Sequence, residues 1–68
     1  MFDTKTEQEI IKRAAQMLRM VQQGKSCSSL YFTGVTMATE RMADGDEVKA
    51  KEYLEYLRLI ERHTGSGL

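Results

Sequence analysis

The sequence predicts a small all-α domain built as a three-helix bundle. Two long stretches carry apolar residues at helical spacing, proline is absent from all 68 residues, and helix-forming residue types are common throughout. We expect helices over residues 4 to 23, 29 to 43 and 46 to 63. The alternative is an α+β fold in which a β-hairpin separates two helices. In both cases residues 1–68 form a single small domain, with a frayed tail at 64–68.

The first helix is expected to begin near Thr4 or Thr6, because each threonine is followed three residues later by a glutamate at the capping-box spacing. Gly24 provides a natural left-handed end for it. Between these signals, the apolar residues share an arc of about 160° on a helical projection. They are Ile10, Ile11, Ala14, Ala15, Met17, Leu18 and Val21.

The middle segment allows two interpretations. Ser28 or Ser29 can cap a helix that runs to Ala43. Against this helix stand residue types that favour β-structure, and they crowd around Gly34, which would allow a hairpin to turn at residues 33–34. These residues are Tyr31, Phe32, Thr33, Val35 and Thr36.

In the hairpin alternative, the order of helix, hairpin and helix resembles that of the small head-to-tail joining proteins of tailed phages. The stretch LEYLRLIERHTG, residues 54–65, is similar to the end of the second helix in those proteins. This architectural resemblance implies a phage virion joining protein as one alternative function.

The last helix, DEVKAKEYLEYLRLIERH, gives the longest uninterrupted helical signal, and Asp46 is placed to cap it. Val48 and Leu59 lie beyond one edge of its apolar arc, so we expect this helix to contact more than one neighbour. Its core face is expected to pack on the first helix, and residues of the middle segment then close the core. The third helix contributes Tyr53, Leu54, Leu57 and Ile60, the first contributes Ile10, Ala14, Leu18 and Val21, and the middle contributes Leu30, Val35, Met37 and Met42.

Charge and composition exclude several classes of protein. Ten basic and ten acidic side chains cancel, which argues against the broad positive field of a nucleic-acid-binding protein. No apolar run approaches the roughly 20 residues of a membrane span, and the N-terminal stretch lacks the apolar core of a signal peptide. The single cysteine, Cys27, suits a reducing compartment. We therefore expect a cytoplasmic protein, in the host cell if a phage encodes it, with no membrane partner.

No catalytic, cofactor-binding or metal-binding residues are predicted, so the chain is not expected to be an enzyme. Cys27 and His63 are a single thiol and a single imidazole far apart in the sequence and form no motif; whether Cys27 is reactive stays open. The acidic cluster of Asp44, Asp46 and Glu47 lacks the twelve-residue pattern of a calcium loop, and helix capping explains it.

Five residues make up the predicted partner-binding surface: Met20, Val48, Tyr56, Leu59 and His63. With balanced charge and no catalytic constellation, they indicate a non-enzymatic protein–protein interaction module. We expect a small adaptor or inhibitor, in the style of phages and mobile elements, that binds a larger protein, itself as a homodimer, or both. A helix-turn-helix-like DNA-binding regulator that uses the last two helices is the second alternative.

Overall fold

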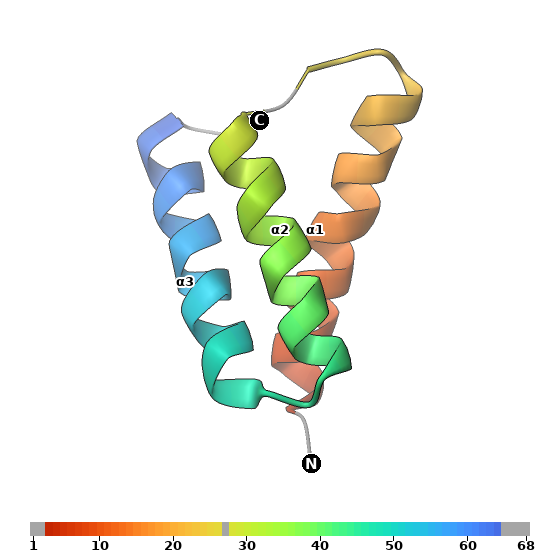
Figure 1. Ribbon diagram of the computed structural model, residues 1–68. Helices are drawn as coiled ribbons and strands as arrows, with labels where there is room; N and C mark the ends of the chain where they lie inside the picture. The colour runs from red at the N-terminus through yellow and green to blue at the C-terminus, as the bar shows by residue number, and fades with distance from the viewer. Residues whose placement is uncertain (1–2, 27, 65–68) are drawn as a thin grey trace.

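A computed structural model describes residues 3–26 and 28–64, and within these ranges the chain forms three helices and no strand (Figure 1). Helix α1 spans Thr4–Gln22, α2 spans Ser29–Ala43 and α3 spans Glu47–Thr64. Each helix runs antiparallel to the next along the chain. The predicted three-helix bundle is confirmed, and the hairpin alternative is wrong.

The ends of α1 differ in part from the prediction. Its N-cap is Asp3, whose backbone carbonyl accepts from the Glu7 amide at 3.0 Å, so the prediction of Thr4 or Thr6 as the cap is wrong. Both threonines already lie inside the helix, and the Thr6 hydroxyl donates back to the Asp3 carboxylate at 2.9 Å. Gly24 has a φ of +73°, which confirms the predicted left-handed position after the helix end.

Ser28 caps α2, as one of the two predicted serines, by accepting from the Tyr31 amide at 3.3 Å. The threonines of α2 fit the helix by hydrogen bonding to it: the Thr36 hydroxyl donates to the carbonyl of Phe32, and that of Thr39 donates to Val35. Residues that favour strands in isolation are therefore held in a helix.

Gly34 serves helix packing rather than a turn. It is buried in the middle of α2, and a Cβ atom placed on it would lie only 2.7 Å from Cδ2 of Leu57 on α3. The missing side chain lets the two helix backbones approach each other closely. The glycine that the sequence suggested as a hairpin turn therefore marks a close contact between α2 and α3.

Helix α3 begins as predicted, because the Asp46 carboxylate accepts from the Lys49 amide at 3.1 Å. The helix ends at Thr64, one residue later than expected. The rest of the predicted frayed tail, residues 65–68, lies outside the described part of the chain.

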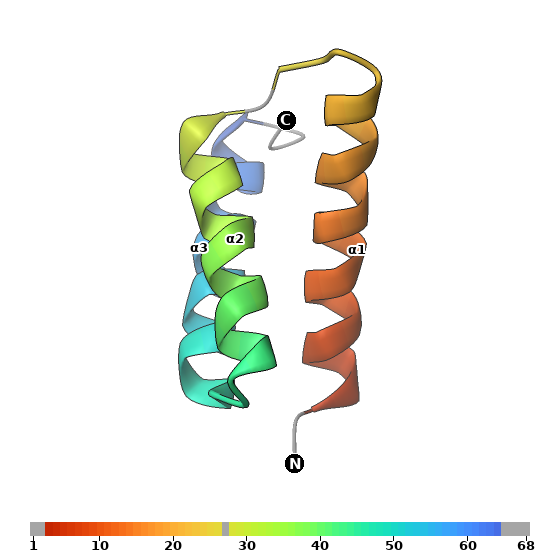
Figure 2. The ribbon, with the colours of Figure 1, turned by 45° about the vertical axis from the view of Figure 1, so that its right-hand side comes forward.

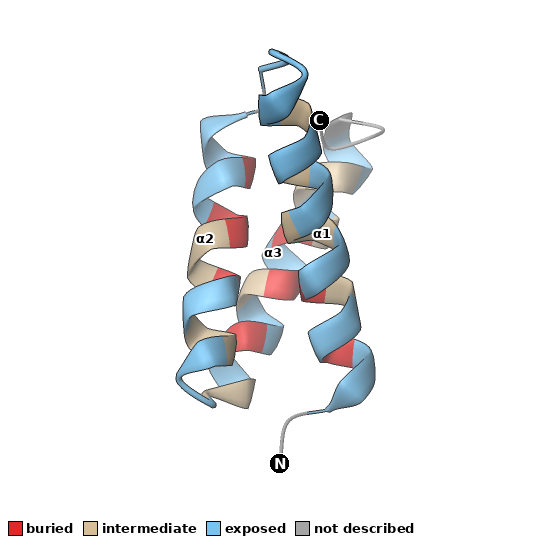
Figure 3. Ribbon diagram, turned by 90° about the vertical axis from the view of Figure 1, so that its right-hand side faces the viewer, coloured by how far each residue is buried: buried red, intermediate tan, exposed pale blue. Residues whose placement is uncertain are grey.

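The core consists of apolar side chains that the three helices turn toward one another (Figure 3). Among the described residues, the buried apolar ones are Ile10, Tyr31, Val35, Ala38, Ala50, Leu54 and Leu57. Partly buried residues packed against them are Ala14, Met17, Met42, Tyr53 and Ile60.

Helix α3 packs chiefly on α2, not on α1, and α1 stands to one side of this pair (Figure 2). The predicted core positions Leu18, Val21 and Leu30 are wrong, because these side chains are 59%, 56% and 60% exposed. Ile10 and Ala14 do face the core as predicted. The apolar arc of α1 is therefore only half used by the bundle.

None of the helices, over the residues described, has the length and apolar character needed to span a bilayer.

Candidate functional site

The described surface is unusually rich in large apolar side chains. Eight of them are exposed, against seven apolar residues in the buried core. Exposed apolar residues that occur singly are ordinary, but those that gather around a hollow indicate a binding surface. The exposed set is Ile11, Leu18, Val21, Leu30, Phe32, Val48, Tyr56 and Leu59.

Three of these residues gather in a groove between α2 and α3, with a volume of about 350 Å³. We call it the α2–α3 groove. It lies where α2 begins and α3 ends, because the two helices are antiparallel and their first and last turns meet at one end of the bundle (Figure 1). The groove is lined by Ser28, Leu30, Tyr56, Leu59, Ile60 and His63.

The lining of the α2–α3 groove combines an apolar interior with polar tips. Leu30, Leu59 and Ile60 supply aliphatic surface from both helices. Tyr56 and His63 each offer a ring with a polar group. Such side chains suit a surface that is exposed to water in the free protein and is covered when a partner binds. The arrangement can bind an apolar side chain from another molecule and orient it with hydrogen bonds at the edge.

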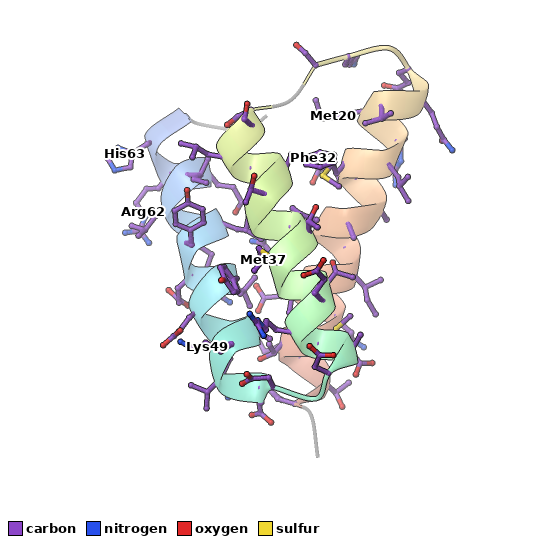
Figure 4. All side chains as sticks on the ribbon, viewed as in Figure 1. Met20, Phe32, Met37, Lys49, Arg62 and His63 are labelled. Carbon is purple, nitrogen blue, oxygen red and sulfur yellow. The ribbon has the colours of Figure 1, made fainter. Side chains whose placement is uncertain are left out.

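The structure brings together three of the five predicted partner-binding residues, namely Tyr56, Leu59 and His63. Val48 lies on the same helix, 68% exposed, but three turns earlier and outside the groove. Met20 is half-buried on α1, and Figure 4 shows it on the opposite side of α2 from His63. The predicted partner-binding surface is therefore divided: three of its residues line the α2–α3 groove, and Val48 and Met20 lie apart from it.

Leu30 is the groove residue that sequence reasoning placed wrongly. The prediction assigned it to the core as a leucine in the first turn of the middle helix. Its neighbour Tyr31 points inward and is fully buried, and the next residue along a helix is rotated by about 100°, so Leu30 is turned toward solvent. The sequence alone does not show that Tyr31, rather than the neighbouring Leu30, is the side chain that is buried.

A second cluster, which we call the polar clamp, joins all three helices. Arg13 on α1 donates two hydrogen bonds to the Glu61 carboxylate on α3, at 2.8 and 2.9 Å. The hydroxyl of Tyr31 on α2 donates to the same carboxylate at 2.9 Å. Beside them, Arg58 on α3 donates to the Glu9 carboxylate on α1 at 2.6 Å. Bidentate arginine–carboxylate pairs of this kind are specific in geometry, so the clamp fixes how α1 sits on the other helices.

The clamp also shifts the protonation equilibria of its members. The hydrogen bond from Arg58 holds the pKa of Glu9 below its ordinary value. Partial burial acts to raise the pKa of Glu61, but the hydrogen bonds from Arg13 and Tyr31 outweigh it, and the pKa lies below the ordinary value. Each carboxylate is thus held in its charged form by a matched cation, which suits a structural role rather than proton transfer.

The remaining chemical candidates do not assemble into a site in the described residues. Asp46 is occupied as a helix cap, and Glu47 pairs with Lys51 at 2.9 Å. No group of three or more metal-binding side chains occurs in residues 3–26 and 28–64. Cys27 lies outside the described part of the chain, so its pairing with His63 stays a hypothesis.

No protein-family model matches this chain, and no curated protein or solved structure matches it significantly. The fold and the groove define only a class, a small three-helix bundle with an apolar groove at one end.

Proposed function

We propose that this protein is a non-enzymatic interaction module that binds an amphipathic helix of another protein in the α2–α3 groove. The observation that carries the proposal is the groove itself, in which Leu30, Leu59 and Ile60 supply an apolar floor from two helices. A groove between two antiparallel helices accepts a third helix, whose apolar residues at i, i+3 and i+4 fill it.

The polar groups at the groove edge support a helix as the occupant. Tyr56 and His63 line the groove beside the aliphatic residues and can hydrogen-bond to the polar side of a bound helix. A ligand that is apolar all round would cover both polar groups without offering them a hydrogen bond, which costs free energy. An amphipathic helix satisfies both parts of the lining.

In a chain of this length, such binding works as a small adaptor or inhibitor, of the kind that phages and mobile elements encode. The module has room for one docked element and, in its described residues, no assembled catalytic group. We place its action in the cytoplasm, where a single cysteine stays reduced.

The paired charges of α3 argue against the DNA-binding alternative. A recognition helix needs free cations for phosphate, yet two of the basic residues of α3 are paired with carboxylates: Arg58 with Glu9 and Glu55, and Lys51 with Glu47.

The test uses a display library of short amphipathic helical peptides, selected against the full chain. We expect selected peptides to bind saturably and to shift the NMR signals of Leu30, Tyr56 and Leu59. The Leu59→Glu variant should weaken binding at least tenfold by placing a charge in the apolar floor. Val48→Glu is the matched control, since Val48 is even more exposed, lies on the same helix and is outside the groove.

Thermal melts of both variants must resemble that of the parent, since both positions are exposed. A selection that yields no saturable peptide, or peptides that bind Leu59→Glu as tightly as the parent, would overturn the proposal. Equal weakening by Val48→Glu and Leu59→Glu would also overturn it, because the binding surface would then extend over α3 rather than lie in the groove.

A further inference from the structure

Helix α1 carries a second apolar surface, which shares no residue with the α2–α3 groove. Ile11 and Leu18 are exposed on α1, and they are seven residues apart, so they lie on one side of the helix, two turns from each other. Between them lie two alanines, of which Ala15 is exposed and Ala14 half-buried. We call these four residues the α1 stripe.

The α1 stripe borders a hollow of about 270 Å³ between α1 and α2. Leu18 and Ala14 line this hollow from α1, while Val35 and Thr39 line it from α2. A helix laid on the stripe therefore meets apolar surface from two helices of the bundle. This is the geometry in which a small bundle gains another helix.

The order of residues in the stripe is self-complementary. When a second α1 lies antiparallel with its Ala15 opposite Ala14, Leu18 of the second copy falls opposite Ile11, and Ile11 of the second copy falls opposite Leu18. The two alanines meet their counterparts at the centre, where small residues allow the backbones to approach closely. A two-fold interface requires this match between the two halves of one patch, whereas binding to a different protein does not.

The charges at the ends of α1 favour the same orientation. Glu7 lies near the start of the helix on the side of the stripe, and Lys25 follows its end. In an antiparallel pair, Glu7 of each copy falls opposite Gln22, the last residue of α1 in the other copy, and Lys25 follows three residues later in the chain. A parallel pair would instead place the two Glu7 side chains beside each other and the two lysines together.

We propose that two copies of this chain pair through the α1 stripe as an antiparallel, two-fold symmetric dimer. Pairing buries Ile11, Ala15 and Leu18, which α2 and α3 leave exposed. It also leaves both α2–α3 grooves open, so the dimer presents two binding sites for the same partner.

The first measurement is the mass of the full chain in solution across a dilution series, by light scattering after size exclusion. The parent is expected to be a dimer that dissociates only on dilution. Leu18→Glu places a charge in the stripe and should weaken dimerisation at least tenfold, while Val48→Glu, exposed elsewhere, should leave it unchanged. A parent that is monomeric at all concentrations overturns the proposal, as does a dimer that Leu18→Glu leaves intact.

Cysteine cross-linking then tests the orientation, in a Cys27→Ser background. Ala15→Cys should form an intermolecular disulfide under mild oxidation, because the two positions nearly coincide at the symmetry axis. Gln8→Cys is the matched control on the same face. In the antiparallel pair its two copies lie roughly 20 Å apart along the helix, beyond the roughly 7 Å between Cα atoms that a disulfide spans.

Cross-linking at both positions would show a parallel pair, and cross-linking at neither in a persistent dimer would show a different interface; each result overturns the proposal. The proposed dimer and the proposed binding of a helix in the groove can be overturned independently of each other. Monomeric Leu18→Glu should still bind a peptide selected for the α2–α3 groove, since Leu18 is not part of that groove.

Discussion

The two contacts that hold this bundle together are built from different interactions. Helices α2 and α3 meet through apolar surface at close range, where Gly34 leaves room for Leu57. Helix α1 joins them through Ile10 in the core and through the polar clamp, in which Arg13 pairs with Glu61 and Arg58 with Glu9. The contact between α2 and α3 depends on the fit of apolar surfaces, whereas the attachment of α1 depends to a large extent on ion pairs.

This difference explains why α1 keeps an exposed apolar stripe. Arg13 faces α3 because it pairs with Glu61, and Leu18 lies about 140° away from Arg13 around the helix. Helix α1 therefore cannot turn Leu18 toward α3 without breaking the ion pair. The polar clamp sets the rotation of α1, and that rotation leaves half of an apolar arc available to a partner.

The largest expected effect lies in the apolar contact. Leu57→Ala should lower the free energy of unfolding by about 2 to 5 kcal/mol, because Leu57 is fully buried and its loss leaves a cavity against Gly34. Leu30→Ala makes the same deletion at a side chain that is 60% exposed, and should change it by about 0.5 kcal/mol or less. Urea unfolding followed by circular dichroism measures both. Similar losses in the two variants would contradict the burial pattern.

The next effect probes the polar clamp. Glu61→Gln should cost about 1 to 3 kcal/mol, because the Arg13 side chain, only 14% exposed, loses the bidentate carboxylate of Glu61 and keeps only the longer contact with the Glu9 carboxylate at 3.7 Å. Glu52→Gln is the matched control at the Lys49–Glu52 pair, where both side chains are more than half exposed, and should cost about 0.5 kcal/mol or less. The same unfolding measurement compares them. If Glu61→Gln were as mild as its control, the Arg13–Glu61 pair would contribute little to holding α1 in place.

A smaller effect is expected at Gly34, where α2 packs closely on α3. Gly34→Val forces a branched side chain against Leu57, and the gain in helix propensity offsets only part of the strain, leaving a net loss of about 1 to 2 kcal/mol. Thr33→Val introduces the same side chain at the exposed neighbouring position and should be nearly neutral. Thermal melts of the two variants would separate these outcomes. A neutral Gly34→Val would mean that α2 and α3 can move apart without loss.

The sequence predicted what local patterns determine. Helical periodicity and the caps at Ser28 and Asp46 placed three helices within a residue or two of their observed ends. The prediction that the last helix packs chiefly on the first was wrong, because an amphipathic arc indicates that a face is buried but not which helix covers it. The role of Gly34 also depends on a contact with Leu57, distant in the chain, which no local signal contains.

The candidate site was predicted only in part, because the sequence shows local spacing but not contacts between distant segments. Tyr56, Leu59 and His63 lie on one helix, so their spacing alone places them on neighbouring faces. Leu30 joins them only because α2 runs antiparallel to α3, and this arrangement is tertiary. The sequence did not reveal the α1 stripe, because Leu18 has the pattern of a core residue. The burial of Ile10 and the ion pairs of Arg13 together turn Leu18 outward.

The smallest effect is a dependence of stability on pH that belongs to the polar clamp. The pKa values of Glu9 and Glu61 are lowered in the folded chain, so the unfolded chain takes up protons first as the pH falls. Their contribution to stability is complete well above the ordinary glutamate pKa of about 4.3. It is lost progressively from about pH 5 downward, as the pH falls through the unfolded and then the folded pKa values. Urea midpoints between pH 6 and 3 should fall for the parent chain.

The double variant Glu9→Gln/Glu61→Gln removes both lowered pKa values and should flatten this fall, although it is less stable at neutral pH. Hydrogen exchange, corrected for the intrinsic effect of pH, locates the change. Amides of α1 should lose protection in acid before those of α2 and α3, because acid neutralises the carboxylates of the clamp but not the apolar contact at Gly34. Equal loss in all three helices would mean that α1 does not open separately, and that clamp and apolar contact form one cooperative unit.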